Sequence, residues 1–459
     1  MSRYKPYPAY KDSGTEWLGE VPEGWRACKL KHLGKLKGGT GFPHHLQGNS
    51  HNEIAFYKSS DLFKSEDGIN LGTTDNTVTY DQAKTIGATI FAPGTLAWGK
   101  IGAASCLNRG RVVQKICCLD NNMTGFIVDE NITLVMYSFY FMSIVDFSIY
   151  AKGGVIPFFS EGEQGNLRAL CPPLNEQERI VDHLDHETTI IDALIQKNTR
   201  LMELLKEKRF ALITAAVTKG LDPNAKMKES GVEWIGEVPE GWEVMQIKRL
   251  ARGNGTLFVG GVWLGGGYER DGEVRYITSS NVGVGNYKDN GGGYISETTF
   301  EELCCEEVLP GDVIISRLTD PIGRACIVPN IGKKIVTSVD NIILRHSLDF
   351  SSKFIVHRFS SLDYFNELNL LASGTTLQRV SREDIGSVRI AFPKIYDQEK
   401  IATYIDNKTN IIDELIEKTK LSIEKLKERR SSFITAAVTG KIDIREAALP
   451  TLSINKIDN

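Results

Sequence analysis

The sequence predicts an α/β (α+β) protein: two globular domains separated by two long helices with the pattern of a coiled coil. The chain is an internal repeat, and its halves are related by a pseudo-twofold axis if the helices pair as an antiparallel coiled coil. Two observations predict this fold class. A charged, leucine-rich stretch from about Asn175 to Thr218 recurs 221 positions later, from Tyr396 to Thr439. Before each copy lie roughly 140 residues of short apolar runs broken by Gly, Asn and Asp, a pattern typical of short strands in a mixed domain. Such self-similarity at a fixed spacing determines the architecture.

The repeated stretch has the spacing of a coiled coil. Its last residues are nearly identical in the two copies, Ile213–Thr218 and Ile434–Thr439. Apolar residues recur at heptad spacing for about five heptads, with Asn198 and Thr419 as polar seam positions that fix register. At 1.5 Å per residue each helix is ~60 Å long. The predicted seam residues are Ile180, Leu184, Ile191, Leu194, Leu201, Leu205, Leu212, Ile401, Ile405, Ile412, Leu415, Leu426 and Phe433.

Each globular region opens with the same segment. Residues Ser13–Trp25 recur at Ser230–Trp242, 217 positions later, each with a Pro-Glu-Gly turn and two tryptophans. We expect the tryptophans to pack on their own domain, with a binding role as the alternative. The predicted boundaries are therefore 1–170 for the first domain, 171–222 for the first helix, 223–391 for the second domain, 392–445 for the second helix and 446–459 for a polar tail.

Composition bounds the class of protein. The chain has 459 residues and a net charge of −4, ordinary for a soluble protein and without the global basic excess of many nucleic-acid binders. Eight cysteines without a C-x-x-C motif fit a reducing cytosol and exclude a zinc or disulfide framework. The apolar run Ile132–Tyr150 has a charged counterpart at Lys353–Leu371, so we expect a buried helix and no membrane span.

Catalytic and cofactor motifs are incomplete. Gly94–Lys100 matches a phosphate-binding loop, but Ile101 stands where Ser or Thr would hold magnesium. The glycine-rich stretch Gly253–Gly267 never completes G-x-G-x-x-G. Histidine clusters do not recur in the second copy, so we expect no metal site. The sequence thus predicts a non-catalytic chain that binds no cofactor of its own.

A few residues suggest nucleic-acid contacts. Lys100 and Arg317 occupy equivalent positions after apolar runs, either as DNA contacts or as solvated loop charges. Trp263 lies within the glycine-rich stretch, Tyr268 and Arg270 come just after it, and all three are candidate contacts of the same kind.

The duplicated openers, the helix starts Asn175–Ile180 and Asp397–Ile401, and the Thr-Ala-Ala-Val-Thr helix ends together resemble the specificity subunits of type I restriction-modification systems. The resemblance covers essentially the whole chain. It implies that each divergent domain is a target recognition domain reading one half of a bipartite, asymmetric DNA sequence, and that the helices set the spacing and dock two methyltransferase subunits. Two restriction (helicase) subunits join that core in systems that cleave DNA. S-adenosylmethionine, ATP and Mg²⁺ belong to those partners, and the implied location is the prokaryotic cytoplasm.

Base-reading candidates follow from loop position and residue type. In the first domain they are Lys58, Ser59, Ser60, Asp61, Lys100, Gly153 and Gly154. In the second they are Trp263, Tyr268, Arg270, Ser279, Ser280, Asn281, Arg317, Thr375, Thr376, Gln378 and Arg379. The alternative function is a non-catalytic coiled-coil scaffold with two protein-binding heads, which accounts for the helices but gives no reason for paired openers on divergent domains.

Overall fold

The computed structural model describes residues 4–101, 110–150, 158–265, 267–374 and 377–445. The chain divides into two compact units. Unit 1 comprises residues 1–197 with 422–459, and unit 2 comprises residues 198–421. The boundaries fall inside the two long helices, so each helix contributes to both units and neither forms a separate domain.

Unit 1 contains short sheets of mostly antiparallel strands. The four-stranded sheet has the order β4 (Gly34–Gly38), β10 (Met123–Val128), β7 (Leu96–Gly99), β8 (Arg111–Val112). The three-stranded sheet has the order β6 (Thr77–Val78), β5 (Ile54–Tyr57), β9 (Cys117–Leu119), with β5 and β9 parallel. Two strand pairs complete it, β1 (Tyr10–Asp12) with β2 (Glu20–Pro22) and β3 (Arg26–Lys29) with β11 (Arg168–Cys171).

Unit 2 repeats this topology. Its four-stranded sheet has the order β15 (Leu257–Gly260), β21 (Asn341–Arg345), β18 (Val313–Ser316), β19 (Ala325–Ile327). Its three-stranded sheet has the order β17 (Gly293–Ile295), β16 (Val274–Ile277), β20 (Lys334–Thr337), again with one parallel pair, β16 and β20. The strand pairs are β12 (Met227–Glu229) with β13 (Glu237–Pro239) and β14 (Glu243–Gln246) with β22 (Arg389–Phe392). The α+β fold class and the internal repeat are confirmed.

Short helices flank these sheets. In unit 1 they are α1 (Tyr80–Thr85), α3 (Val135–Ser143) and α4 (Glu161–Asn166). In unit 2 they are α6 (Glu297–Glu302), α7 (Ser352–Arg358), α8 (Leu362–Leu370) and α9 (Arg382–Ser387). Helix α3 buries Tyr137 to Met142 in the unit 1 core, as expected for the apolar run that contains it. No helix in the described part of the chain is long and apolar enough to cross a membrane.

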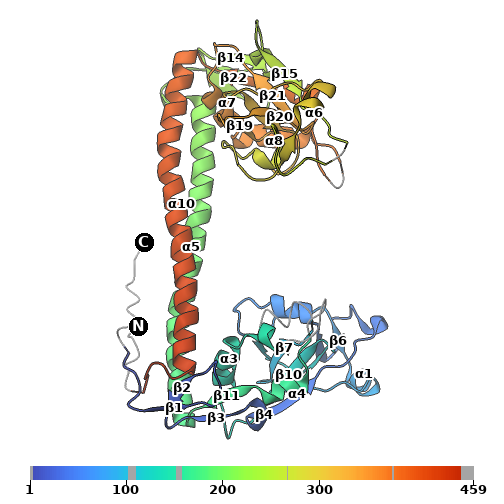
Figure 1. The fold of residues 1–459 in the computed structure, drawn as a ribbon, viewed down its shortest axis with the longest axis vertical. Coiled ribbons are helices and arrows are strands. Elements are labelled where there is room, and N and C mark those ends of the chain that lie inside the picture. Colours follow the sequence, from blue (N-terminus) through green and yellow to red (C-terminus); the bar gives the residue numbers. More distant parts are fainter. Residues whose placement is uncertain (1–3, 102–109, 151–157, 266, 375–376, 446–459) are drawn as a thin grey trace. The chain divides into compact units, whose positions relative to one another are not determined.

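The repeated stretch forms two continuous helices, α5 (Leu174–Lys219) and α10 (Ile395–Val438), of 46 and 44 residues. In unit 1 the start of α5 packs with the end of α10, and Ile180 and Leu184 share a core with Ile434 and Val438. In unit 2 the end of α5 packs with the start of α10. Early residues of one helix therefore meet late residues of the other, so the pairing is antiparallel (Figure 1).

One of the two predicted seam rows is displaced by one residue. Leu184, Ile191, Ile405, Ile412 and Phe433 are buried, and Leu205, Leu212 and Leu426 are half-buried. Leu194, Leu201 and Leu415, in contrast, are 43%, 46% and 44% exposed, so assigning them to the seam is wrong. Ile180 and Ile401 are buried in the cores of the globular parts.

Polar side chains occupy the true second row. Thr188 and Thr409 are 3% and 4% exposed. Each hydroxyl donates to the backbone carbonyl four residues earlier, so no hydroxyl is buried without a hydrogen-bond partner in this pair. Farther along this row lie Arg209 and Arg430, equivalent residues in the repeat. Arg209 Nε lies 2.8 Å from Asp413 in unit 2, and Arg430 Nε lies 2.9 Å from Asp192 in unit 1.

A repeated glutamine joins each long helix to its globular part. In unit 1, Gln177 Oε1 accepts hydrogen bonds from Leu134 N–H (2.8 Å) and Thr133 Oγ1 (3.0 Å), just before α3. In unit 2, Gln398 Oε1 accepts from Ser351 N–H (2.9 Å), just before α7. Both side chains are almost fully buried, at 0% and 1% exposure. Each glutamine thus satisfies a backbone donor that a helix start leaves unpaired.

Each opener packs on the end of a long helix. Trp25 is buried in unit 1, and its Nε1–H donates to Glu176 Oε1 (3.0 Å). A Cβ placed on Gly440, which follows α10, would lie 3.3 Å from Trp25 and 2.3 Å from Pro22 Cδ. In unit 2 a Cβ on Gly220, which follows α5, would lie 3.6 Å from Trp242. The tryptophans Trp25 and Trp242 therefore serve packing.

Candidate nucleic-acid interface

Loops at one edge of the unit 2 sheets enclose a groove of about 350 Å³. The loop after β15 joins it through a bridge between Val262 and Ser338, and the loop after β18 joins it through a bridge between Leu318 and Arg379. The groove is lined by Trp263, Tyr268, Tyr276, Thr278, Ser280 and Asp340, among others. Trp263 is 73% exposed and Tyr268 is 49% exposed, so the groove offers flat aromatic surface to a ligand.

Polar groups in this groove can donate and accept hydrogen bonds. Ser280 Oγ is exposed and lies 2.7 Å from Thr278 Oγ1. The Asp340 carboxylate is partly exposed and lies 3.0 Å from Arg379 Nη2. Burial, followed by the Asp340 charge, raises the pKa of Tyr276 to about 12, so its hydroxyl stays protonated at neutral pH. Hydroxyl, carboxylate and guanidinium groups beside aromatic rings are the side-chain types that read base edges and stack on bases.

Unit 1 has loops equivalent to these, but they carry different side chains. Lys58 Nζ donates to Gln47 Oε1 (2.5 Å) and lies 5.7 Å from the centre of the Phe42 ring. The backbone N–H of Ser59 donates to Asp120 Oδ2 (3.3 Å), whereas in unit 2 Ser279 Oγ donates to Asn341 Oδ1 (3.1 Å). Ser60 is exposed at the tip of this turn. The backbone framework is shared, and the side chains it presents differ.

Two predicted reading residues are structural, and their assignment to DNA is wrong. Asp61 is 2% exposed; its carboxylate accepts from Lys58 N–H (2.9 Å) and Thr74 Oγ1 (3.0 Å). Asn281 is 0% exposed; its Oδ1 accepts from Thr278 N–H (2.9 Å) and its Nδ2 donates to Lys288 O (2.9 Å). Both cap a single 3-10 turn after a strand, and neither presents an atom to a ligand.

The equivalent cations Lys100 and Arg317 also form an ion pair or hydrogen bonds with other parts of their own unit. Lys100 is 9% exposed and pairs with Glu161 at 3.0 Å. Arg317 donates from Nε to Val380 O and from Nη1 to Val339 O, each at 3.0 Å. Burial, followed by the nearby Arg379 guanidinium, lowers the pKa of Arg317 from its usual value. These side chains support the loops, and their role as direct DNA contacts stays a prediction.

The remaining candidates divide by position. Arg270, Gln378 and Ser280 are exposed, and Arg379 is half-buried. The Gln378 carbonyl accepts from Thr319 N–H (3.4 Å), which holds the 377–380 segment beside the groove. The candidates Gly153, Gly154, Thr375 and Thr376 lie outside the described residues.

Four polar lining residues escaped the sequence-based prediction, namely Tyr276, Thr278, Ser338 and Asp340. Asp340 directly precedes β21 and aligns with Asp120, but Asp120 is buried and accepts from Ser59 N–H and Asn122 N–H. In unit 2 Asn341 is hydrogen-bonded to Ser279, and Asp340 faces the groove. The Asp340–Asn341 pair, which aligns with Asp120–Asn121, was the available signal. Within the described ranges no three His, Cys, Asp or Glu side chains gather as a metal site.

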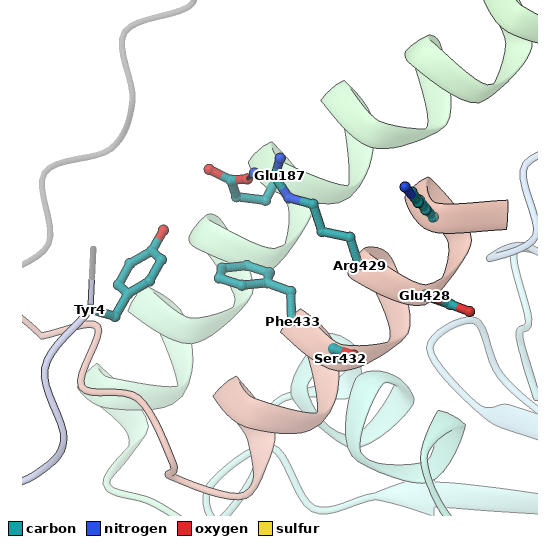
Figure 2. A pocket seen from close by; sticks show the side chains of 7 residues that line it. Tyr4, Glu187, Glu428, Arg429, Ser432 and Phe433 are labelled. Carbon is teal, nitrogen blue, oxygen red and sulfur yellow. Dashed lines mark hydrogen bonds and ion pairs between the residues drawn. The ribbon is translucent and has the colours of Figure 1, made fainter. Parts of the chain in front are cut away.

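A second hollow, of about 640 Å³, lies on the helix pair in unit 1 (Figure 2). Figure 2 shows the Arg429 side chain of α10 extending toward Glu187 of α5, at 3.5 Å, with Phe433 and Tyr4 beside them. The rings of Tyr4 and Phe433 lie 5.5 Å apart. This hollow mixes charged and aromatic groups on the coiled-coil surface of unit 1.

Comparison with known proteins places these features in a family. Residues 239–425, most of the second domain and of α10, match the family described as "Type I restriction modification DNA specificity domain". This part of the chain is therefore similar to the specificity subunits of type I restriction-modification systems. The resemblance predicted from the openers and helix ends is therefore confirmed.

Two relatives come from Methanocaldococcus jannaschii. The type I restriction enzyme MjaVIII specificity subunit is 24% identical over 318 residues, 68% of this chain and 71% of that protein. The MjaX specificity subunit is 25% identical over 287 residues, and the match covers 61% of this chain and 60% of that protein's length.

Solved structures agree in fold. A chain described under "complex assembly and conformational transition of the type I R-M system" gives a TM-score of 0.67 at 14% identity, covering 92% of this chain and 99% of that one. The HsdS subunit from Thermoanaerobacter tengcongensis gives 0.50 at 14% identity, covering 92% and 98%. At this identity the likeness concerns the fold.

Proposed function

We propose that this chain is the DNA sequence-specificity subunit of a type I restriction-modification complex. Each unit reads one half of a bipartite, asymmetric duplex target. The long helices fix the separation of the half-sites and dock two methyltransferase subunits, together with two restriction subunits where the system cleaves DNA. Chemistry belongs to these partners, which bind S-adenosylmethionine, ATP and Mg²⁺; the chain itself binds none and acts in the cytoplasm.

One observation carries this proposal: the two units share strand order and junctions but present different side chains at the equivalent loops. Unit 2 offers exposed Trp263 and Tyr268 around a groove with Asp340 and Ser280. Unit 1 places Lys58 and Ser60 on the corresponding turn. Two different readers on one framework fit an asymmetric target, because paired half-sites mirror the geometry of the protein that reads them. A scaffold with two protein-binding heads gives no reason for this combination.

The test is methylation by the complete complex. The full chain is co-expressed with a cognate methyltransferase, and long-read sequencing identifies the methylated motif. We expect adenine methylation at one interrupted motif, and none without this chain. Methylation of the same motif when this chain is omitted would exclude the specificity role.

Exchange of domains sharpens this test. Replacing residues 30–165 by the equivalent segment of another family member should change one half of the motif, and the spacer should stay the same because the helices are untouched. Trp263→Ala together with Ser280→Ala should relax the other half only, since a good base contact contributes roughly 1–3 kcal/mol of discrimination. A change in both halves from either variant would refute the assignment of one unit to one half-site.

A further inference from the structure

Both units carry the same exposed basic cluster, away from the loops that differ. We call it the basic strip. In unit 1 it consists of Lys31, His32, Lys35 and Arg168; in unit 2 it consists of Lys248, Arg249, Arg252 and Arg389. The first three residues of each set are related by the 217-residue displacement of the openers, and the arginines by the 221-residue displacement of the helices. All eight are exposed except Arg168, which is half-buried.

The backbone places these residues together in the same way in each unit. The N–H of Leu30 donates to Leu167 O at 2.8 Å, and the N–H of Ile247 donates to Val388 O at 3.0 Å. These bonds follow the β3–β11 and β14–β22 pairs, in which Arg168 lies opposite Lys29 and Arg389 lies opposite Gln246. Residues far apart in the chain are therefore neighbours in each strip.

The lysine stems also have matched supports. A Cβ on Gly165 of α4 would lie 3.5 Å from Lys31 Cβ, and a Cβ on Gly386 of α9 would lie 3.4 Å from Lys248 Cβ. The short helix passes close under the lysine in both units, so the charged ends leave the surface from equivalent points. The strip is thus a repeated feature of the framework.

Carboxylates on the adjoining short helices are engaged elsewhere. On α4, Glu161 pairs with Lys100 at 3.0 Å and Glu163 accepts from Ser160 N–H. On α9, Glu383 pairs with Arg382 at 2.6 Å and Asp384 accepts from Ser381 Oγ. Asp129, which follows β10, accepts from Asn131 N–H. Across the described ranges no ion pair neutralises a strip side chain. In unit 1, Lys29 and Arg168 even face each other directly, which is unfavourable without an anion nearby.

We propose that the basic strips bind the phosphate backbone of the duplex, one strip beside each half-site, independently of sequence. This inference rests on the proposed function. A feature kept in two units that present different reading loops cannot encode the sequence that distinguishes them, so it contacts a partner that both units share. The phosphate backbone is common to both half-sites, and contacts to it set register without carrying sequence information. A net charge of −4 makes a local cation cluster necessary for such contacts.

The composition of the strips favours phosphate over a protein partner. Three of the eight side chains are lysine, which is depleted at protein–protein interfaces, and the strips lack the aromatic and other large apolar side chains that form the cores of such interfaces. The segments 31–35 and 248–252 contribute only Leu33 and Leu250 as large apolar residues, and both are buried. Point charges on flexible stems suit phosphate oxygens.

The test removes two charges from each strip in the full chain. The variant Lys31→Gln/Lys35→Gln/Lys248→Gln/Arg252→Gln is compared with wild type in complex with the methyltransferase. Binding is measured from 0.05 to 0.3 M salt on a duplex carrying the methylated motif and on an unrelated duplex. Affinity should fall on both duplexes by the same factor, roughly fivefold at 0.15 M salt for each phosphate that the strips no longer neutralise. The slope of log K against log salt should become shallower by about 0.9 for each such phosphate. The methylated motif should not change.

A matched control removes charge elsewhere: Lys84→Gln/Lys115→Gln in unit 1, both exposed, should alter the slope far less than Lys31→Gln/Lys35→Gln. Equal slopes for the two double variants would overturn the proposal, as would loss of methyltransferase binding with an unchanged slope, which would indicate a protein-docking surface. An altered motif would overturn it too, because the strip would then read bases. Absence of methylation with the wild-type chain would instead refute the proposed function. The salt slope of the isolated full chain still tests the strip in that case.

Discussion

Units 1 and 2 have the same residues where a long helix joins the globular part, and they have different residues at their loops. Gln177 and Gln398 make equivalent hydrogen bonds to the segment before α3 and α7. At the loops, by contrast, unit 2 exposes Trp263 over a groove, whereas the loops of unit 1 place Lys58 against Phe42. The comparison teaches that the duplicated sequence marks where a long helix meets a domain, and the diverged sequence marks what the domain presents.

The largest expected effect comes from replacing the glutamine that joins a long helix to its globular part. Gln177→Met or Gln398→Met leaves buried backbone groups unpaired, among them Leu134 N–H or Ser351 N–H, at about 3 kcal/mol each. Denaturant midpoints should fall similarly for the two variants, and amide exchange at Leu134 or Ser351 should accelerate. Gln196→Met, at an exposed position on α5, is the control. A junction variant no less stable than this control would show that the glutamine is not structural.

Replacing the glycine that follows each long helix should destabilise the protein by unequal amounts. Gly440 (φ +71°) and Gly220 (φ +74°) share a backbone conformation that costs an L-residue about 1 kcal/mol. Only at Gly440 would a Cβ also meet Pro22 Cδ, at 2.3 Å. Gly440→Ala should therefore destabilise by about 2 kcal/mol more than Gly220→Ala in thermal or denaturant unfolding. Gly14→Ala, with φ +75° and no atom within 4 Å of the Cβ, measures the backbone cost alone. Equal losses at Gly440 and Gly14 would exclude the clash.

The smallest expected effect concerns two equivalent aspartates whose hydrogen-bonding partners differ in charge. Asp185 of α5 accepts from the neutral Tyr140 hydroxyl (2.5 Å), while its equivalent Asp406 accepts from His357 and pairs with Lys353. The His357 hydrogen bond, then Lys353, lowers the pKa of Asp406 to about 2.

Because the folded pKa of Asp406 lies below the unfolded value of about 4, its stabilisation is present above pH 4 and is lost as the pH falls toward 2. Asp406→Asn should cost below about 1 kcal/mol at pH 7, since the pair is partly exposed, and less at pH 3. Denaturant unfolding at pH 7, 4 and 3 measures this. A cost that grows on acidification would contradict the assignment.

The sequence predicted the fold correctly where a residue type has a single structural role. Repeated Gln177 and Gln398, paired tryptophans and heptad leucines identified the two halves and the helices. The displaced seam row did not follow, because a search for apolar residues selects Leu194 and passes over Thr188, whose hydroxyl is satisfied within its own helix. Likewise, a polar residue between two strands can face a ligand or cap a turn, and the sequence alone does not distinguish the role of Asp61 from that of Asp340. Only burial does so.

The openers and helix ends have a consequence for how this chain was assembled. In unit 1 the opener packs on Gly440, at the end of the second repeat, and Asp443 N–H donates to Lys5 O at 2.8 Å. In unit 2 the second opener packs on Gly220, at the end of the first repeat. Each core is therefore built from both sequence repeats. Two separate copies of a half-length ancestor would already bury the same surfaces by exchanging helix ends, and gene fusion would then have freed one reader to diverge from the other.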